Sequence, residues 1–176
     1  LWSTESPLAS SGIILDIDLA FDSNDVPHIV HSVDTHDLVY TTKFAGRWVS
    51  ITLTDAAANI NVSFTDVEIV VASTNTIQIY FHWNNGEYAR GLECTTSCHE
   101  STSWSLSNVD FSTGAGPGGG VNVDVALDSN DLMHMALIIE NGSTDIVGWG
   151  HYDAGGVFSD YVVPNGGTVS STNSSV

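Results

Sequence analysis

Residues 17–33 read IDLAFDSNDVPHIVHSV, and residues 123–139 read VDVALDSNDLMHMALII. The two stretches agree in apolar and polar class at almost every position, and the tetrapeptide Asp-Ser-Asn-Asp is identical in both. Alternating residues before the tetrapeptide predict a strand, and Asn and Asp favour a turn because they tolerate left-handed backbone and hydrogen-bond their own chain. A stretch repeated in this way predicts one supersecondary unit that is copied along the chain.

The unit is predicted to occur three times. Taking Asp22, Ala72 and Asp128 as equivalent positions gives spacings of 50 and 56 residues. Trp48, Trp104 and Phe158 repeat at spacings of 56 and 54 residues. In the first copy, runs of strand-forming residues cover 17–21, 28–32, 38–44 and 48–53, with short turns between them. Four short strands joined in this way predict an antiparallel meander.

The composition excludes several classes of function. Three Lys plus Arg stand against 21 Asp plus Glu, which gives a formal net charge of -18 over 176 residues. This charge repels nucleic-acid phosphates and anionic lipids, so we expect no nucleic-acid partner and no membrane insertion. The sequence has no apolar run of about 18 residues, the length of a membrane-spanning helix. The start Leu1-Trp2-Ser3 has no signal-peptide pattern and no initiating Met, so we expect a processed or excised segment.

The predicted fold class is all-β, with three four-stranded antiparallel blades of a β-propeller, because repeated meanders of this length are typical of propeller blades. Three blades are too few to close a ring, since propellers have about four to eight. We therefore expect further blades of the same protein, or self-association in which two sets of three make six. The alternative is a pair of tandem β-sandwich domains. The expected divisions are 1–12 (lead-in or end of a preceding blade), 13–55, 56–113 and 121–164 (blades), 114–120 (Gly-rich connection) and 165–176 (polar tail).

The repeat resembles the sialidase-like, Asp-box-related propeller repeat. In that repeat an apolar strand ends in Asp-Ser-Asn-Gly-x-Pro-His-Ile, which is similar to residues 22–29 here except that Asp25 replaces the Gly. The Asp box itself, SxDxGxxW, is represented in outline by His151, Asp153, Gly155 and Phe158 in the third copy, and by Thr41 and Trp48 in the first. The resemblance implies a propeller. It also implies that a sialidase would need a cluster of arginines for its substrate carboxylate, whereas this chain has only Arg47 and Arg90.

One carboxylate recurs at the same place in the first strand of each copy. These residues are Asp18, Glu68 and Asp124. The first strand of a blade is the innermost, so the three are expected near the central channel, where Ca²⁺ or another hard cation could bind to their oxygens. The alternative is a water-filled channel wall that is polar without binding a metal. The Asp-Ser-Asn-Asp stretches are interpreted as hairpin turns, because they lack the Gly and the distal Glu of a calcium loop.

Three aromatic residues lie at or near predicted strand ends and could stack on sugar rings. They are Trp83, Trp149 and Tyr152, and the alternative for each is packing in the core or between blades. Trp48 and Trp104 are assigned to packing because their position recurs with the blade. His28 and His134, at equivalent places, are expected to bond within their own blades, because one His per blade does not make a zinc site.

Two kinds of residue point to an extracellular location. Cys94 and Cys98 are predicted to form a small-loop disulfide, which requires an oxidising compartment. N-x-[ST] sequons at Asn61, Asn141 and Asn173 are candidate glycosylation sites.

The leading hypothesis is an extracellular, non-catalytic propeller module with a structural or adhesive role, as a subunit of a larger surface assembly or filament. The alternatives are a lectin-like module and a glycosidase fragment with its active site elsewhere.

Overall fold

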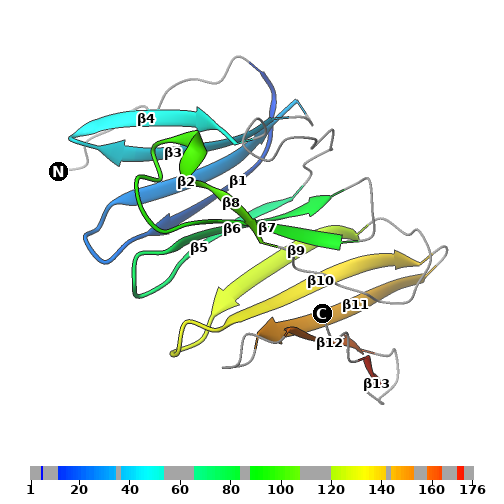
Figure 1. Cartoon of the computed structure of the whole chain (residues 1–176). Coiled ribbons are helices and arrows are strands. Elements are labelled where there is room, and N and C mark those ends of the chain that lie inside the picture. Colours follow the sequence, from blue (N-terminus) through cyan, green and yellow to red (C-terminus); the bar gives the residue numbers. More distant parts are fainter. Residues whose placement is uncertain are drawn as a thin grey trace.

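The computed structural model describes residues 5, 12–34, 37–53, 66–83, 88–107, 120–141, 144–152, 158–163 and 170–172. The described chain forms three antiparallel sheets, none of which closes on itself, and one turn of 3-10 helix (Figure 1). The predicted all-β class is confirmed. We number the sheets 1 to 3 in chain order.

Sheets 1 and 2 each have four strands in chain order, so each is a simple meander. The β3–β4 turn at Ala45 and Gly46 has positive φ at both residues, as a two-residue hairpin requires. Sheet 1 contains β1 (Ile14–Phe21), β2 (Pro27–Val33), β3 (Asp37–Phe44) and β4 (Arg47–Thr52). Sheet 2 contains β5 (Val67–Val71), β6 (Ile77–Trp83), β7 (Tyr88–Cys94) and β8 (Ser105–Ser107), with the 3-10 turn η1 (Ser101–Ser103) before β8.

Sheet 3 has five strands in the order β13-β12-β11-β10-β9. It contains β9 (Gly120–Leu127), β10 (Met133–Asn141), β11 (Thr144–Tyr152), β12 (Phe158–Val163) and β13 (Ser170–Thr172). The fifth strand lies in the stretch 165–176, which was predicted as a polar tail. Its three residues are polar, but Ser and Thr can pair along an exposed sheet edge, and β12 offers that edge.

The turn between the first two strands has the same backbone in all three sheets. Asp25, Asn75 and Asp131 have φ of 60°, 63° and 61°, and each donates its N–H to the residue three positions earlier. Asp22 and Asp128 also accept the N–H groups two and four residues ahead at 2.8–3.0 Å, which explains why Asp begins the turn in sheets 1 and 3.

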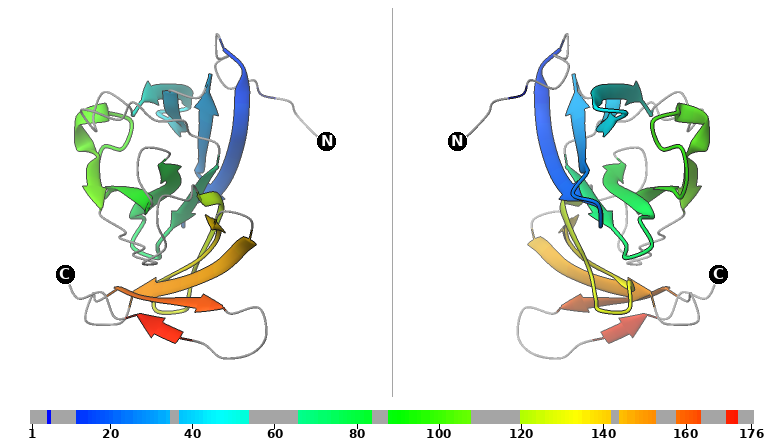
Figure 2. Two further views of the ribbon diagram at one scale, coloured as in Figure 1. Left: turned by 90° about the vertical axis from the view of Figure 1, so that its right-hand side faces the viewer. Right: turned by 90° about the vertical axis from the view of Figure 1, so that its left-hand side faces the viewer.

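The sheets pack face to face in chain order, and two apolar clusters fill the spaces between them (Figure 2). We call the face of a sheet that points to the preceding sheet its leading face, the opposite face its trailing face, and the contact between two sheets a joint. In the first joint, the leading face of sheet 2 packs on the trailing face of sheet 1. The second joint packs sheet 3 on sheet 2 in the same way, through Val123, Val125, Met133 and Met135 against Tyr80.

The first strands lie side by side along one edge of the stack, because β1 contacts β5 and β5 contacts β9. We call this the inner edge. It carries the carboxylates that the sequence singled out.

Candidate functional site

The inner edge is acidic because the first strands alternate. In β1, Asp16 and Asp18 point to the trailing face, whereas the apolar residues between and after them point to the leading face. The same alternation places Asp66 and Glu68 at the start of sheet 2 and Asp124 in β9. The inner edge is therefore a row of carboxyl groups contributed by consecutive sheets.

Three of these carboxylates accept hydrogen bonds from the next sheet. Val67 N–H donates to Asp16 Oδ2 at 2.8 Å and Ile69 N–H donates to Asp18 Oδ2 at 2.9 Å. One sheet further along, Val123 N–H donates to Asp66 Oδ2, which repeats the contact of Asp16. The first strand of a sheet pairs with a strand on one side only, so the backbone N–H groups on its unpaired side have no strand acceptor. The carboxylates of the preceding sheet supply acceptors for these groups.

The carboxyl groups also lie close enough to one another to share protons. Burial, followed by the neighbouring Asp18 carboxylate, raises the pKa of Glu68 to about 8, and Asp124 and Asp66 add to the shift. Burial and the neighbouring Asp16 likewise raise the pKa of Asp66, although its bond from Val123 opposes the shift. Two carboxyls in contact cannot both ionise without repulsion. At neutral pH Glu68 therefore holds a proton and can donate it to Asp18.

A pocket of about 270 Å³ opens at the inner edge, where the start of sheet 2 lies beside the trailing face of sheet 3. Carboxyl groups line one side of it and small or branched apolar side chains line the other. Its residues are Asp66, Glu68, Val123, Asp124, Ala136, Ile138 and Val147. The pocket is thus lined by three carboxyl groups and four apolar side chains, and the trailing face of sheet 3 supplies three of the apolar ones, Ala136, Ile138 and Val147.

Of the predicted metal set, Asp18 and Glu68 lie in contact and Asp124 lies within electrostatic reach of Glu68. Across the described ranges, no three His, Cys, Asp or Glu side chains are arranged to hold a metal ion. Asp18 uses its two oxygens for the N–H groups of Leu19 and Ile69. A role for Ca²⁺ stays a prediction.

The predicted sugar-stacking aromatics do not form one platform. Trp149 lies on the trailing face of sheet 3, where its ring stacks on His151 at 4.7 Å and His134 at 5.9 Å between centroids. Tyr152 is on the opposite face of β11 and packs against the cluster around Tyr80. Trp83 ends β6, and its side chain lies outside the described residues.

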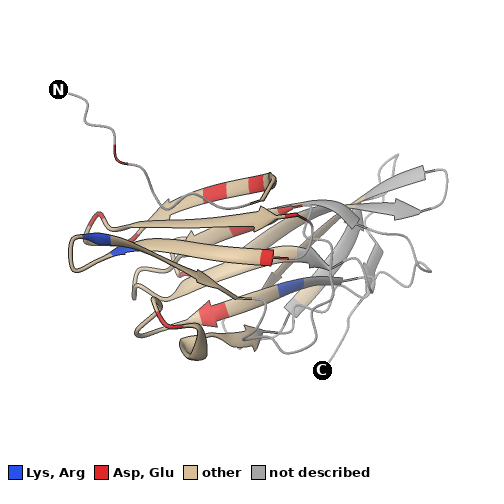
Figure 3. Ribbon diagram, turned by 90° about the horizontal axis from the view of Figure 1, so that it is seen from above, with Lys and Arg blue, Asp and Glu red and all other residues tan. Residues whose placement is uncertain are grey.

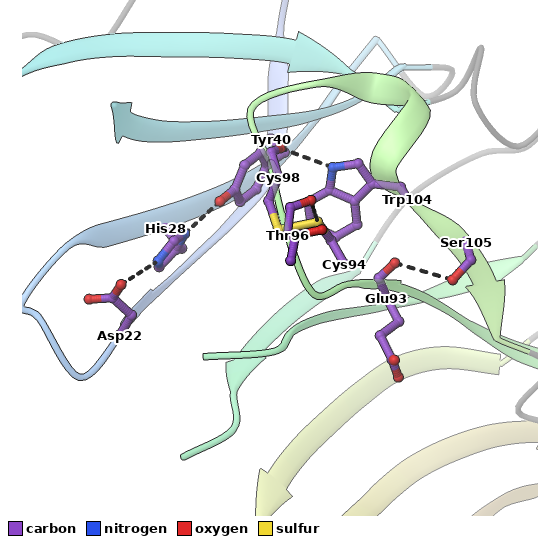
Figure 4. The surroundings of a disulfide bond; sticks show 9 residues. All are labelled: Asp22, His28, Tyr40, Glu93, Cys94, Thr96, Cys98, Trp104 and Ser105. Atoms are coloured by element: carbon purple, nitrogen blue, oxygen red, sulfur yellow. Dashed lines mark hydrogen bonds and ion pairs between the residues drawn. A yellow bond between two sulfur atoms is a disulfide. The ribbon is translucent and has the colours of Figure 1, made fainter. Parts of the chain in front are cut away.

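The first joint is built around a chain of polar and aromatic contacts (Figure 4). His28 Nδ1 lies 2.5 Å from the hydroxyl of buried Tyr40, and its Nε2 lies 3.8 Å from Asp22 Oδ2. Tyr40 meets the edge of Trp104, at 4.9 Å between centroids, and Trp104 Nε1 donates to Cys98 O at 3.1 Å. Burial lowers the pKa of His28 and raises that of Tyr40, so both side chains are neutral in this joint. His134 pairs with Asp128 in sheet 3 as His28 pairs with Asp22, at 3.9 Å.

Cys94 and Cys98 form the disulfide, with Cys94 buried in the cluster of the first joint. Of the candidate glycosylation sites, Asn61 and Asn173 lie outside the described residues, and so do Asp153 and Gly155 of the Asp-box outline. Asn141 ends β10, but its side chain is not described.

Positive charge is sparse on the described strands (Figure 3). Lys43 and Arg47 belong to the β3–β4 hairpin and Arg90 belongs to β7, so the two arginines come from different sheets. Lys43 pairs with Glu5 at 2.6 Å.

Sequence reasoning missed Asp16 and Asp66. The signal was present, because an acid two residues before Asp18 and before Glu68 repeats in both copies. It also missed Asn75 and Asp131 as acceptors, since the turn pattern does not indicate which sheet their side chains face.

No protein-family model matches this chain, and no curated protein does. Among solved structures, one match is a fucose lectin from Kordia zhangzhouensis in complex with methyl-fucoside. It is 11% identical, with a TM-score of 0.42, over 92% of this chain and 100% of that chain. This TM-score is too low to establish a shared fold. In the described part of the chain, no helix has the length and hydropathy that a membrane crossing requires.

Proposed function

We propose that the chain is a non-catalytic, extracellular β-propeller module with a structural or adhesive role. The observation that carries the proposal is the repetition of the joint. Sheet 2 meets sheet 1, and sheet 3 meets sheet 2, through the same faces and through the same kind of carboxylate bond at the inner edge. Sheets that repeat one joint around a common inner edge are the arrangement of propeller blades. The resemblance to the sialidase-like repeat supports the same conclusion.

The use of the inner carboxylates favours a structural role over a catalytic one. Asp16, Asp18 and Asp66 each accept a backbone N–H from the next sheet, so their oxygens hold the stack together. The two arginines do not gather to receive a substrate carboxylate, as a sialidase would require. The disulfide, the acidic composition and the sequons support a location outside the cell.

Engineered disulfides test the stacking of the sheets. Ser73 and Asp131 touch across the second joint, where Ser73 N–H donates to Asp131 Oδ1 at 2.9 Å. We expect the double variant Ser73→Cys/Asp131→Cys to form an intramolecular cross-link that peptide mapping detects. The single variants Ser73→Cys and Asp131→Cys are the controls and should not form this link. Two independent β-sandwich domains would give no Ser73–Asp131 link.

A sugar-binding role is the second candidate, and Trp149 is the residue that favours it. Its half-exposed ring stacks with two histidines on the trailing face of sheet 3, which offers an aromatic surface next to polar groups. A glycan array with the wild type, Trp149→Ala and Tyr152→Phe tests this role. Binding that Trp149→Ala abolishes and Tyr152→Phe retains would support it, whereas no binding by any of the three would remove it.

A further inference from the structure

We infer that a second copy of this chain joins the first head to tail. The leading face of sheet 1 in each copy packs on the trailing face of sheet 3 in the other, so the pair adds two joints of the kind that each chain already contains twice. The inference rests on the proposed blade-like stacking, and its tests separate the two.

Along β1, the leading face of sheet 1 is apolar and exposed, unlike its equivalents in the other two sheets. Further across the same face, Val33 and Thr41 are buried and Glu5 pairs with Lys43. Leu19 in β1 is 49% exposed, whereas the equivalent Ile69 and Val125 are 3% and 7% exposed because a preceding sheet packs on them. Ile17 and Phe21 on the same face of β1 are also exposed. Three large apolar side chains in a row form a patch of the kind that marks a contact site. The strand is therefore patterned for a joint that the described residues do not make.

The trailing face of sheet 3 is the matching half. Leu38 on the trailing face of sheet 1 is 1% exposed under sheet 2, whereas the equivalent Val147 is 50% exposed. Ile138 and Ala136 are exposed beside it. Both ends of the stack thus expose apolar side chains at positions whose equivalents are buried inside it.

The hydrogen bonds between the turns of neighbouring sheets leave an unpaired donor at one end of the stack and an unpaired acceptor at the other. Ser23 N–H donates to Asn75 Oδ1 at 3.0 Å across the first joint, and Ser73 N–H donates to Asp131 Oδ1 at 2.9 Å across the second. The next donor in this series is Ser129 in sheet 3, and the acceptor that begins the series is Asp25 in sheet 1. Within the described residues neither the Ser129 N–H nor the Asp25 carboxylate has a partner. A third joint would pair them.

The count of sheets selects two copies. The described residues form three sheets, so two copies of this stretch supply six and three copies supply nine. Propellers close with roughly four to eight blades, which favours the pair. In a pair, each copy contributes one leading and one trailing face, and both new joints form at once. A closed pair leaves no end face to recruit more copies.

Mass in solution is the first test. Light scattering on the purified chain of 18.7 kDa should give twice that mass at micromolar concentration. Phe21→Asp and Val147→Asp change exposed residues on the two end faces, so each monomer should keep its circular dichroism spectrum. Each variant should weaken the pair at least ~100-fold, because two unpaired carboxylates become buried per dimer. Leu106→Asp, at an exposed site on β8, is the matched control and should stay dimeric.

Cross-linking tests the register. Asp25→Cys/Ser129→Cys should give a covalent dimer under mild oxidation, and the internal pair Ser73→Cys/Asp131→Cys calibrates the geometry within one chain. If the internal pair links while the chain is a stable monomer, or while Asp25→Cys/Ser129→Cys stays unlinked, the inference is overturned and the stacking stands. If the internal pair fails to link, the stacking itself is wrong.

Discussion

The Glu68 carboxyl lies where two first strands come together, and its protonation follows from its neighbours. Asp18 faces it from β1, Asp124 from β9 and Asp66 from the residue just before β5. Burial, and after it the three neighbouring acids, favour the neutral form and raise the pKa to about 8, so the carboxylate predominates only above that pH.

This protonation predicts an unusual pH dependence of stability. The folded pKa of about 8 lies above the ordinary value of 4.5, so the folded protein binds more protons than the unfolded chain between these values. The contribution of Glu68 is therefore present in acid and is lost as the pH rises through about 8. Glu68→Gln imitates the protonated form, so we expect it to gain on the order of 1 kcal/mol at pH 9, after allowance for solvent screening.

Thermal melts at pH 5 and pH 9 check this prediction. The gain of Glu68→Gln over the wild type should be small at pH 5 and clear at pH 9. Asp37→Asn, at an exposed carboxylate that begins β3, is the control for lost charge. An equal gain at both pH values would contradict the assignment of the proton to Glu68.

The carboxylate of Asp16 has a different role, because it accepts the N–H of buried Val67. Asp16→Ala removes the acceptor, and an unpaired buried N–H costs about 1–3 kcal/mol. Asp16→Asn keeps an oxygen in place and removes the charge that raises the pKa of Asp66, so it should be close to wild type. Urea unfolding at pH 7 distinguishes the two variants, and equal losses would show that the charge matters more than the hydrogen bond.

At the scale of the element, the loop between β7 and β8 is held by the disulfide and by the bond from Trp104 to Cys98 O. A loop this short gives a disulfide contribution of about 2 kcal/mol by the chain-entropy account. We expect Cys94→Ala/Cys98→Ala to lose that amount in urea unfolding. A reductant should lower the stability of the wild type and leave the variant unchanged, and an effect of reductant on both would exclude the disulfide as the cause.

The elements are also where the sequence was most informative. Alternation and turn residues predicted the first three strands of sheet 1 to within a few residues, because each hairpin is local and its turn requires Asn, Asp or Gly. Contacts between the sheets were harder to predict from the sequence. The sequence placed Asp18, Glu68 and Asp124 at equivalent positions, but the bond from Ile69 N–H to Asp18 depends on how closely two sheets approach. Trp149 and Tyr152 lie on opposite faces because their spacing within one strand is odd. In the sequence both lie at or near predicted strand ends, so this alternation was not applied to them.

At the scale of the whole molecule, the net charge of -18 opposes the proposed pairing of two copies. Repulsion between exposed charges is screened by salt, with a Debye length of about 10 Å at 0.1 M and about 3 Å at 1 M. We therefore expect the dimer to dissociate more readily at 0.05 M NaCl than at 1 M NaCl. Sedimentation velocity at the two salt concentrations measures this, and weaker association at high salt would indicate that the joint is held by ion pairs instead of apolar contact.

The direction of the bonds across each joint has a consequence for how such a chain can change over time. Asp16 reaches forward to Val67 and Asp66 reaches forward to Val123, while Asn75 and Asp131 reach back to Ser23 and Ser73. The same acceptor positions thus recur from one joint to the next, and Asn122, which stands in sheet 3 where Asp16 and Asp66 stand in sheets 1 and 2, keeps an oxygen acceptor there. Under the proposed stacking, duplicating or deleting the gene segment for one sheet would leave an oxygen acceptor at each of these positions, so the number of stacked sheets can change without the loss of these bonds.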